Sequence, residues 1–241
     1  MRSSLKGANV LLFGGSGGIG TSLLQSLARA GVASIVVAAH KVSSHDVVGV
    51  DISTEVIDVT SLASVQDLAR RLSARDIALV INCAGVNSNE SLFSTNAALN
   101  ARREMEVNCF GLMNVGLSFG PALAARGGGV LMNVLSFLSH ASLPPLATYC
   151  ASKSAAHSLN LSLRAELRPK GVRVCGVYPM AVDTSMSRDQ QGPKMSPEML
   201  AQEMVNFLAG DCEDLYPGEA LHAYDAWLRD PRGFQAEMLS S

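Results

Sequence analysis

The chain of 241 residues is long enough to bury a core of its own, and its 48% hydrophobic and 17% charged residues exclude an intrinsically disordered protein. Lys and Arg total 19 against 21 Asp and Glu, so the net charge is −2 and no basic stripe indicates a nucleic-acid-binding surface. The longest apolar runs, such as residues 35–39, have the length of a strand, and we therefore expect no membrane-spanning segment.

The cysteines are odd in number, widely spaced and include no CxxC pair. Reduced, mostly buried thiols are the simplest interpretation, which predicts a cytoplasmic protein without a metal site. The five are Cys83, Cys109, Cys150, Cys175 and Cys212.

Short apolar runs alternate along the chain with segments whose apolar residues recur at helical spacing. The runs predict strands at 10–13, 35–39, 55–59, 77–81, 130–134 and 172–177. The predicted helices are at about 21–30, 62–72, 98–125, 147–167 and 196–209. Ser61 and Ser196 are the expected N-caps of two of these helices.

Continuous apolar strands separated by amphipathic helices are typical of a parallel sheet that helices cover on both faces. Right-handed crossovers then give an α/β, doubly wound (Rossmann) fold in a single domain over residues 1–241. Ligands of such sheets bind beyond the carboxyl ends of the strands, so functional residues are expected there.

A glycine-rich segment at 14–20 lies directly between the first predicted strand and the first predicted helix. Glycines at this place allow a tight turn and a close approach of backbone to a pyrophosphate, while the helix N-terminus offers free N–H groups to the anion. The alternative is a turn needed only for strand–helix packing. The strand–turn–helix context favours dinucleotide binding.

Two further segments follow predicted strands. Asp58 ends the third strand, where its carboxylate is able to accept a hydrogen bond from an adenine amino group or to serve as a turn or cap acceptor. Residues 82–85 end the fourth strand, and their small side chains either let a ribose lie close to the backbone or form an ordinary loop.

Tyr149 and Lys153 are four residues apart on a predicted helix and therefore share one face. A free phenol has a pKa of about 10, and a nearby ammonium lowers it, which makes the tyrosine an acid/base catalyst for a carbonyl or carbinol oxygen. Ser136 follows the fifth strand, where its hydroxyl could bind the same oxygen. The alternatives are a solvated helix face for the pair and a cap role for the serine.

Asn108 is a polar residue in an apolar stretch of the long predicted helix. Its side chain is expected either to bond a helix carbonyl and hold a water on a proton path, or to be a satisfied polar group of the core. The four polar residues fall at their expected places in one doubly wound order, which strengthens the catalytic interpretation of the whole set.

Together, residues 13–20, 82–85 and 149–153, with Asn108 and Ser136, resemble the short-chain dehydrogenase/reductase family. The resemblance covers about residues 6–186. It implies a Rossmann fold and NAD(P)(H)-dependent oxidoreduction.

By this resemblance, Tyr149 is the general acid/base, Lys153 binds the nicotinamide ribose and lowers the pKa of the phenol, Ser136 orients the substrate oxygen, and Asn108 supports the proton relay. The same comparison assigns cofactor contacts to Tyr149, Lys153, Gly14, Ser16, Gly17, Gly18, Ile19, Gly20, Asp58, Val59, Asn82, Ala84, Gly85, Pro179, Val182 and Thr184.

Some positions depart from the family pattern. Phe13 stands where Thr is usual, Cys83 replaces a usual Asn, and Met180 replaces a usual Gly. The first change removes a hydrogen bond onto the second turn, and the last is expected to narrow the substrate side of the site.

The tip of the second strand decides the expected cofactor. Relatives that prefer NAD carry an acid there, which bonds the adenosine ribose hydroxyls. Here residues 38–41 hold no acid, and His40 and Lys41 are available to a 2′-phosphate. We therefore predict NADP(H), with NAD(H) as the alternative.

Apolar side chains in loops near the proposed carbonyl site predict a pocket for a hydrophobic ketone or secondary alcohol, although some could simply pack in the core. His140 is either a polar contact of that pocket or a solvated loop residue. Residues 184–196 are expected to form a lid over the substrate. The pocket residues are Leu138, Leu143, Leu146, Met180 and Met186, with Met195 nearby.

The resemblance thins over residues 215–241, where we expect a short seventh strand at 215–218 and helices at 219–228 and 234–239. Family members usually assemble through the two long helices, which predicts a homodimer or homotetramer. A carbonyl reductase or alcohol dehydrogenase is the leading function. The alternatives are a non-catalytic dinucleotide-binding regulator and an isomerase or dehydratase of the same fold.

Overall fold

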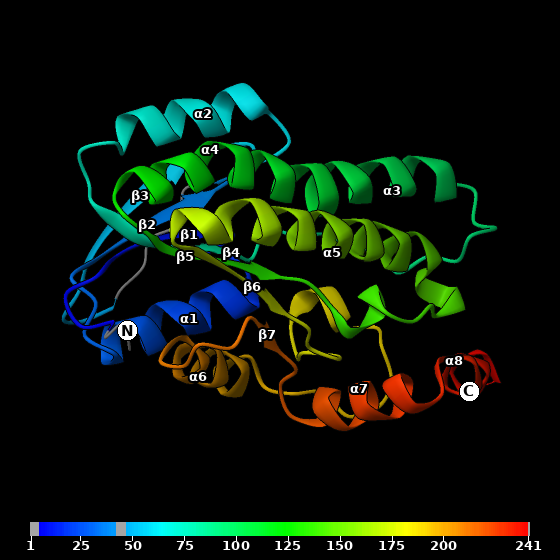
Figure 1. The fold of residues 1–241 in the computed structure, drawn as a ribbon. Helices are drawn as coiled ribbons and strands as arrows, with labels where there is room; N and C mark the ends of the chain where they lie inside the picture. Colours follow the sequence, from blue (N-terminus) through cyan, green and yellow to red (C-terminus); the bar gives the residue numbers. More distant parts are fainter. Residues whose placement is uncertain (1–4, 42–46, 241) are drawn as a thin grey trace.

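The computed structural model describes residues 5–41 and 47–240, which form a parallel sheet between two layers of helices (Figure 1). Within these residues the sheet has seven strands in the order β3-β2-β1-β4-β5-β6-β7. They are β1 (Asn9–Phe13), β2 (Ser34–Ala39), β3 (Asp51–Val56), β4 (Ile77–Asn82), β5 (Gly129–Val134), β6 (Val172–Val177) and β7 (Asp214–Leu215). The predicted doubly wound α/β fold is confirmed.

Helices α1 and α6 cover one face of the sheet, and α2, α4 and α5 cover the other (Figure 1). The Ser61 and Ser196 hydroxyls accept hydrogen bonds from backbone N–H groups of α2 and α6, as predicted. The helices are α1 (Gly18–Arg29), α2 (Leu62–Arg71), α3 (Ala97–Glu104), α4 (Gly111–Ala125), α5 (Ala147–Leu167), α6 (Pro197–Leu208), α7 (Glu219–Arg229) and α8 (Pro231–Ser240).

The central strands are apolar throughout because both of their faces are buried. In β1, Val10 and Leu12 pack into the core beneath α1 and α6, while Leu11 and Phe13 pack into the core beneath α2 and α4. All four are 0% exposed. This two-sided burial explains why continuous apolar runs, rather than alternating ones, mark these strands in the sequence.

The third strand was predicted at 55–59, and that position is wrong. The chain pairs Asp51 with Ser34 and Val56 with Ala39, so β3 ends at Val56. As an edge strand, β3 is only partly buried and carries polar residues, so it lacks the apolar run that marks the inner strands. Asp58 consequently lies in the loop after the strand.

The long helix predicted at 98–125 is interrupted. A π-helical turn, η1 (Met105–Phe110), separates α3 from α4 and contains Asn108. Such turns frequently occur at functional sites. By length and composition, the run Ala97–Ala125 would be long and apolar enough to cross a membrane, but 56% of its most apolar window is buried inside the protein. We interpret it as a core helix.

The C-terminal helices lie on the same side of the molecule as α6 (Figure 1). β7 comprises only Asp214 and Leu215, rather than 215–218. Pro231 begins α8, three residues before the predicted start, because proline is well tolerated in the first turn of a helix. The tail is therefore an ordered helical pair.

Candidate functional site

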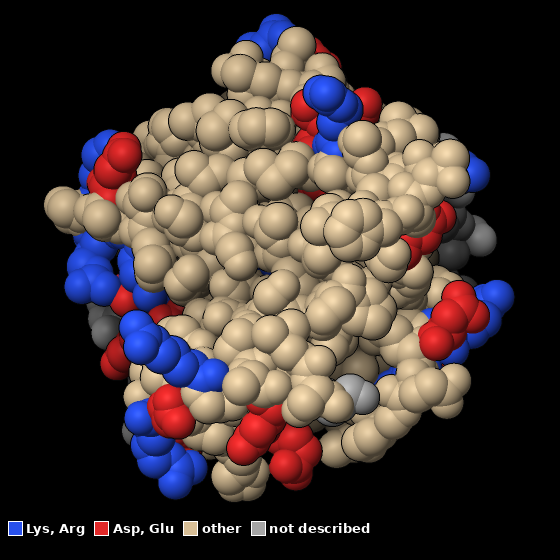
Figure 2. Space-filling model, turned by 90° about the vertical axis from the view of Figure 1, so that its right-hand side faces the viewer, with Lys and Arg blue, Asp and Glu red and all other residues tan. Residues whose placement is uncertain are grey.

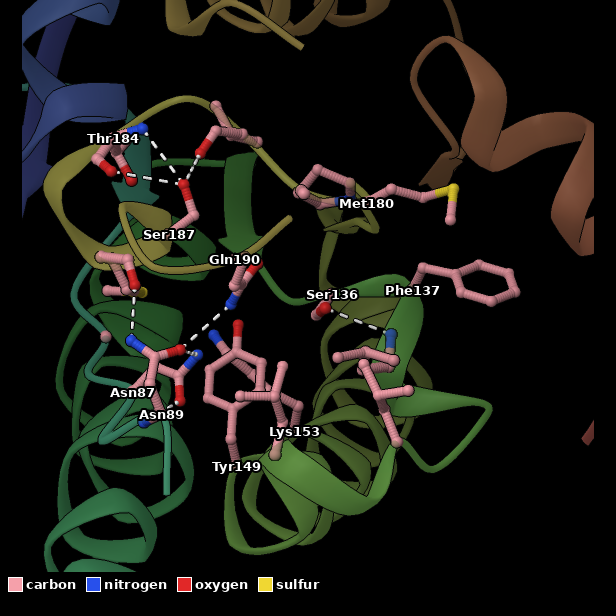
Figure 3. A pocket seen from close by; sticks show the side chains of 18 of the residues that line it. Asn87, Asn89, Ser136, Phe137, Tyr149, Lys153, Met180, Thr184, Ser187 and Gln190 are labelled. Carbon is pink, nitrogen blue, oxygen red and sulfur yellow. Dashed lines mark hydrogen bonds between the residues drawn. The ribbon is translucent and has the colours of Figure 1, made fainter. Parts of the chain in front are cut away.

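A pocket of about 500 Å³ opens at the carboxyl ends of the strands, where the fold predicts a ligand. Ser136, two residues after β5, lies on its floor together with Tyr149 and Lys153 from α5 (Figure 3). The spacing of four residues brings the tyrosine and the lysine to the same face of α5, as the sequence predicts.

The lysine is fixed by the end of β5. Its Nζ donates a hydrogen bond of 3.0 Å to the carbonyl O of Val134 and lies 5.7 Å from the centroid of the Tyr149 ring. Lys153 is only 5% exposed, so its ammonium is held inside the pocket rather than on a solvated helix face. The solvated-face alternative for the pair is thereby excluded.

The pKa values of these two groups reflect their burial. Loss of solvent raises the pKa of Tyr149 to about 12, and a hydrogen bond with Ser136 only partly opposes this. Loss of solvent also lowers the pKa of Lys153 to about 8. The phenol pKa, which we predicted the lysine would lower, is therefore raised in the protein alone, because desolvation outweighs the hydrogen bond with Ser136.

Asn108 anchors the loop after β4 rather than a helix carbonyl. Its Oδ1 accepts a hydrogen bond of 2.8 Å from the N–H of Val86, and its Nδ2 donates to the O of the same residue at 2.9 Å. The amide also donates to the Ser152 hydroxyl at 2.9 Å. Asn108 is thus a satisfied buried group that ties this loop to α5, and its part in a proton relay stays a prediction.

The glycine segment forms the tight turn that was expected. Gly14 has a φ of +74°, and a Cβ there would lie 2.8 Å from the backbone N of Ala84. A Cβ on Gly20 would overlap the carbonyl O of Gly14. The turn needs glycine at both positions because two backbone segments approach closely.

The N-terminus of α1 is available to an anion. Gly17 is its N-cap, no side chain of a described residue caps the helix, and its first turn holds no acidic residue. Ser16, Gly17 and Gly18 are partly or fully exposed beside it. Free backbone N–H groups at a helix N-terminus suit a pyrophosphate, so this turn fits a dinucleotide.

Polar groups in the loops after β3 and β4 form hydrogen bonds with neighbouring residues of the protein. Oδ1 of Asp58 accepts hydrogen bonds from the N–H and the hydroxyl of Thr60, which lower the pKa of the carboxyl group. The carbonyl O of Val59 accepts from Asn114, and Oδ1 of Asn82 accepts from the N–H of Ala84. The turn-acceptor role of Asp58 is therefore real, and the proposed adenine and ribose contacts remain predictions.

Five further predicted cofactor residues line the pocket together with Ser136, Tyr149 and Lys153; they are Ile19, Gly85, Pro179, Val182 and Thr184. The predicted lid, residues 184–196, is closed at its base by the bridge between Val182 and Met195. His40 and Lys41 are exposed just beyond the end of β2, and the charge of His40 acts on Asp58.

All five predicted substrate-side residues line the pocket, namely Leu138, Leu143, Leu146, Met180 and Met186. Met195 instead packs against the core beneath α1 and α6. Sequence reasoning missed Asn87, Asn89, Gln190, Phe137 and Met238, which also line it. The two asparagines follow Gly85 closely, a signal that was available, whereas Met238 lies in α8 and carries no sequence signal.

His140 is neither a pocket contact nor a solvated residue. Its ring lies among aromatic side chains, 5.1 Å from Tyr178 and 5.2 Å from Trp227 between centroids, and its Nε2 is 3.1 Å from the Tyr216 hydroxyl. Burial lowers the pKa of His140 to about 4, so the ring is neutral at physiological pH. The loop from 137 to 146 is therefore held against α7.

The described part of the chain contains neither a disulfide nor a group of side chains arranged to hold a metal ion. All five cysteines lie within it, and each is free of a disulfide. Among residues 5–41 and 47–240, no three His, Cys, Asp or Glu side chains gather in an arrangement that could hold a metal ion.

Comparisons with known proteins agree with this geometry. A family model described as short chain dehydrogenase matches residues 8–194. A crystal structure of a short chain dehydrogenase from Burkholderia cenocepacia in complex with NADP superposes with a TM-score of 0.92 at 33% identity, covering 98% of this chain and 99% of that one.

Two relatives found by sequence are similar to parts of this chain. The probable oxidoreductase EphD of Mycobacterium tuberculosis is 35% identical over 134 residues, which are 54% of this chain and 22% of that protein. The chain therefore matches only about a fifth of that relative. The galactitol 2-dehydrogenase (L-tagatose-forming) of Cereibacter sphaeroides is 30% identical over 76% of this chain and 74% of that protein.

Proposed function

The chain belongs to the short-chain dehydrogenase family, and from that premise we propose that it interconverts a ketone and a secondary alcohol by hydride transfer with NADP(H). Its substrate would be a largely hydrophobic small molecule, and Tyr149 would be the general acid/base. The cofactor, when bound, supplies the hydride.

The observation that carries this proposal is the Ser136–Tyr149 pair beside a buried lysine on the floor of an apolar pocket. With a pKa of about 12, the Tyr149 hydroxyl keeps its proton at neutral pH in the free protein and is ready to give it to a carbonyl oxygen that gains charge. The Ser136 hydroxyl, which partly opposes the rise in the pKa of the same phenol, would hold that oxygen in place. A protein that only senses a dinucleotide has no need of this pair.

The cofactor preference is supported by the residues at the carboxyl end of β2. The exposed His40 and Lys41 would face a 2′-phosphate, and no acidic residue stands between 38 and 41 to bond a ribose diol instead. The relative from Burkholderia cenocepacia was solved with NADP. The N-terminus of α1 would hold the pyrophosphate.

The substrate side supports an apolar molecule. Leucine and methionine side chains of the loops after β5 and β6 line the pocket, and one of them, Met180, is labelled in Figure 3. The face of the molecule at the carboxyl ends of the strands carries few charged side chains near its centre (Figure 2). Phe93, 96% exposed, and Met180, 46% exposed, lie in loops at this end of the sheet.

We further propose a homo-oligomer that assembles through the face of α3, α4 and α5, and a cytoplasmic location. Leu99 and Leu117 on α3 and α4 and Leu161 on α5 are 68%, 49% and 43% exposed, respectively, which is the apolar surface such an interface requires. Free thiols are typical of a reducing compartment. Light scattering after gel filtration would test the assembly, and a monomer at micromolar concentration would contradict it.

The reaction is tested by following the absorbance of NADPH while a panel of apolar ketones is added. We expect at least one ketone to be reduced, with the corresponding alcohol as product. If no ketone is reduced and no secondary alcohol is oxidised, although the cofactor binds, the non-catalytic alternative is favoured.

The cofactor preference is tested by titrating the protein with NADPH and NADH. We expect Lys41→Ala to raise the Kd of NADPH about tenfold while the Kd of NADH changes little, because only NADPH carries the 2′-phosphate. Lys170→Ala is the matched control, because Lys170 is an exposed lysine just before the start of β6, away from the carboxyl ends of the strands. Tighter binding of NADH by the unaltered protein would overturn the preference.

A further inference from the structure

One wall of the pocket consists of carboxamide side chains. Asn87 and Asn89 come from the loop after β4, and Gln190 comes from the lid (Figure 3). Figure 3 shows Asn87 and Asn89 to the left of Tyr149 and Gln190 above it, with Phe137 and Met180 to the right. The pocket therefore has a polar wall facing an apolar one.

The backbone on both sides of Asn87 is held by buried side chains. Asn108 exchanges two hydrogen bonds with the backbone of Val86, and Oε1 of Glu104 accepts from the N–H of Ser88 at 2.8 Å. Glu104 and Asn108 are 0% and 3% exposed and lie four residues apart on the same helical run. The position of Asn87 is thus set by the core rather than by solvent.

Asn89 joins this loop to the lid. It has a φ of +52°, in the left-handed region, and its side chain donates a hydrogen bond of 2.8 Å to the O of Met186. Its Oδ1 accepts from Nδ2 of Asn87 at 3.0 Å and from Nε2 of Gln190 at 3.1 Å. A strained backbone that persists in this way is typical of a functional site.

The wall keeps unused hydrogen-bonding capacity. A carboxamide has two N–H donors and one carbonyl acceptor, and Asn87, Asn89 and Gln190 each use one donor within the network. Oε1 of Gln190 accepts no hydrogen bond from any described residue. The wall can therefore give a hydrogen bond to a ligand and accept one from it, which suits a hydroxyl group.

The wall offers no positive charge. Among the described residues that line the pocket, Lys153 is the one cation, and it already donates to Val134 at the catalytic end. Asp189, which also lines the pocket and precedes Gln190 in the chain, would repel an anion. A carboxylate or phosphate bound here would be partly desolvated without a partner, which is unfavourable.

We propose that Asn87, Asn89 and Gln190 are specificity-determining residues that bind a hydroxyl group of an uncharged substrate, while Phe137 and Met180 on the other side bind its apolar part. The substrate class is thus a neutral hydroxyketone or the matching diol, rather than a keto acid or a phosphate ester. The inference rests on the proposed function, because it specifies the carbonyl substrate of the same site.

The test compares three substrates of equal chain length: a methyl ketone, its hydroxymethyl analogue and the corresponding α-keto acid. With saturating NADPH, kcat/KM for the hydroxymethyl ketone should exceed that for the methyl ketone about tenfold, since a hydrogen bond to a preorganised group contributes about 1.4 kcal/mol. The keto acid should be the poorest substrate. A keto acid as the best substrate would overturn the proposal.

The variant Gln190→Leu keeps the size of the side chain but removes its hydrogen bonds. It should reduce the preference for the hydroxymethyl ketone to about twofold or less, whereas damage to the lid alone would lower both rates equally and leave the preference intact. Gln202→Leu is the matched control, because Gln202 is an exposed glutamine of α6 that also bonds a neighbouring asparagine. The control should retain the full preference.

Binding separates failure of this inference from failure of the proposed function. Calorimetry on the NADPH-loaded Tyr149→Phe variant should show tighter binding of the hydroxymethyl ketone than of the methyl ketone, whether or not either is reduced. Equal binding, or a Gln190→Leu variant that weakens NADPH rather than the hydroxyketone, would overturn the inference. Absence of any carbonyl reduction by the unaltered protein would instead contradict the proposed function.

Discussion

The proposed catalytic floor of the pocket consists of Tyr149 and Lys153 on α5 and of Ser136, two residues after β5. The rim of the pocket consists of loops after β4 and β6 and of α8. The floor is fixed by the sheet, since Lys153 bonds the last carbonyl of β5. The rim is fixed by side chains such as Gln235, which exchanges two hydrogen bonds with the backbone of Ser142. The difference indicates that the chemistry depends on regular elements and the specificity on their connections.

The two regions also differ in how strongly their side chains are buried and in the consequence of that burial. On the floor, burial keeps a phenol protonated and makes an ammonium unfavourable, so the proposed proton donor is present at some cost in stability. On the rim, Met180 and Met186 are 46% and 37% exposed, a surface that a substrate can cover. Changes on the floor should therefore affect turnover, and changes on the rim should affect substrate affinity.

The largest effect separating the two regions is expected for Lys153→Met. Activity should fall about 10²- to 10⁴-fold, because the proton transfer loses its buried ammonium. The melting temperature should rise, because a charge is no longer buried in the pocket. Steady-state rates and thermal unfolding measure the two effects, and a variant that is less stable at pH 7 would contradict the account of the floor.

The stability gain should depend on pH. Folding lowers the pKa of Lys153 from 10.5 to about 8, so between these values the unfolded chain binds more protons than the folded one. The stability of the unaltered protein therefore rises with pH through this window, relative to the variant. The difference in melting temperature should be largest below pH 8 and should shrink toward pH 10.5; a constant difference would show that the lysine is not buried as a charge.

A smaller effect is expected for the glycine turn, which belongs to neither region. Gly20→Ala places a Cβ against the carbonyl O of Gly14, and such overpacking costs about 1–3 kcal/mol. The Kd of NADPH should rise about tenfold or more. In Gly210→Ala, by comparison, the new Cβ would lie 3.6 Å from the O of Phe207, an ordinary contact, and cofactor binding should not change.

The smallest effect is expected on the rim at α8. Gln235→Ala removes the two hydrogen bonds to Ser142, whereas the edge contact of Phe234 with Phe137, 5.5 Å between centroids, remains. Because Met238 of α8 lines the pocket, KM should rise about two- to fivefold, with a smaller change in kcat. A loss confined to kcat would show that α8 acts on the floor instead.

Much of the fold and of the floor could be predicted because both depend on periodicity and on spacing along one element. The spacing of Tyr149 and Lys153 placed them correctly, and two-sided burial made the inner strands visible as apolar runs. The edge strand β3 was misplaced because its half-exposed, polar sequence gives no such run.

The rim could not be predicted in the same way, because its residues meet only through tertiary contacts. Met238 reaches the pocket from the far end of the chain, and Gln190 meets Asn89 across about a hundred residues. His140 was misjudged because the aromatic residues around it come from α5, from the residue that follows β6 and from the C-terminal segment. The pKa of Tyr149 was misjudged because spacing shows the lysine but not the loss of solvent.

The central claim is that the Tyr149 hydroxyl transfers the proton while other groups hold the cofactor. The most direct measurement compares Tyr149→Phe with the unaltered protein in both ketone reduction and NADPH affinity. The account predicts a loss of turnover of about 10²- to 10⁴-fold with a Kd for NADPH within about twofold of the original. A variant that reduces ketones at the original rate would contradict it.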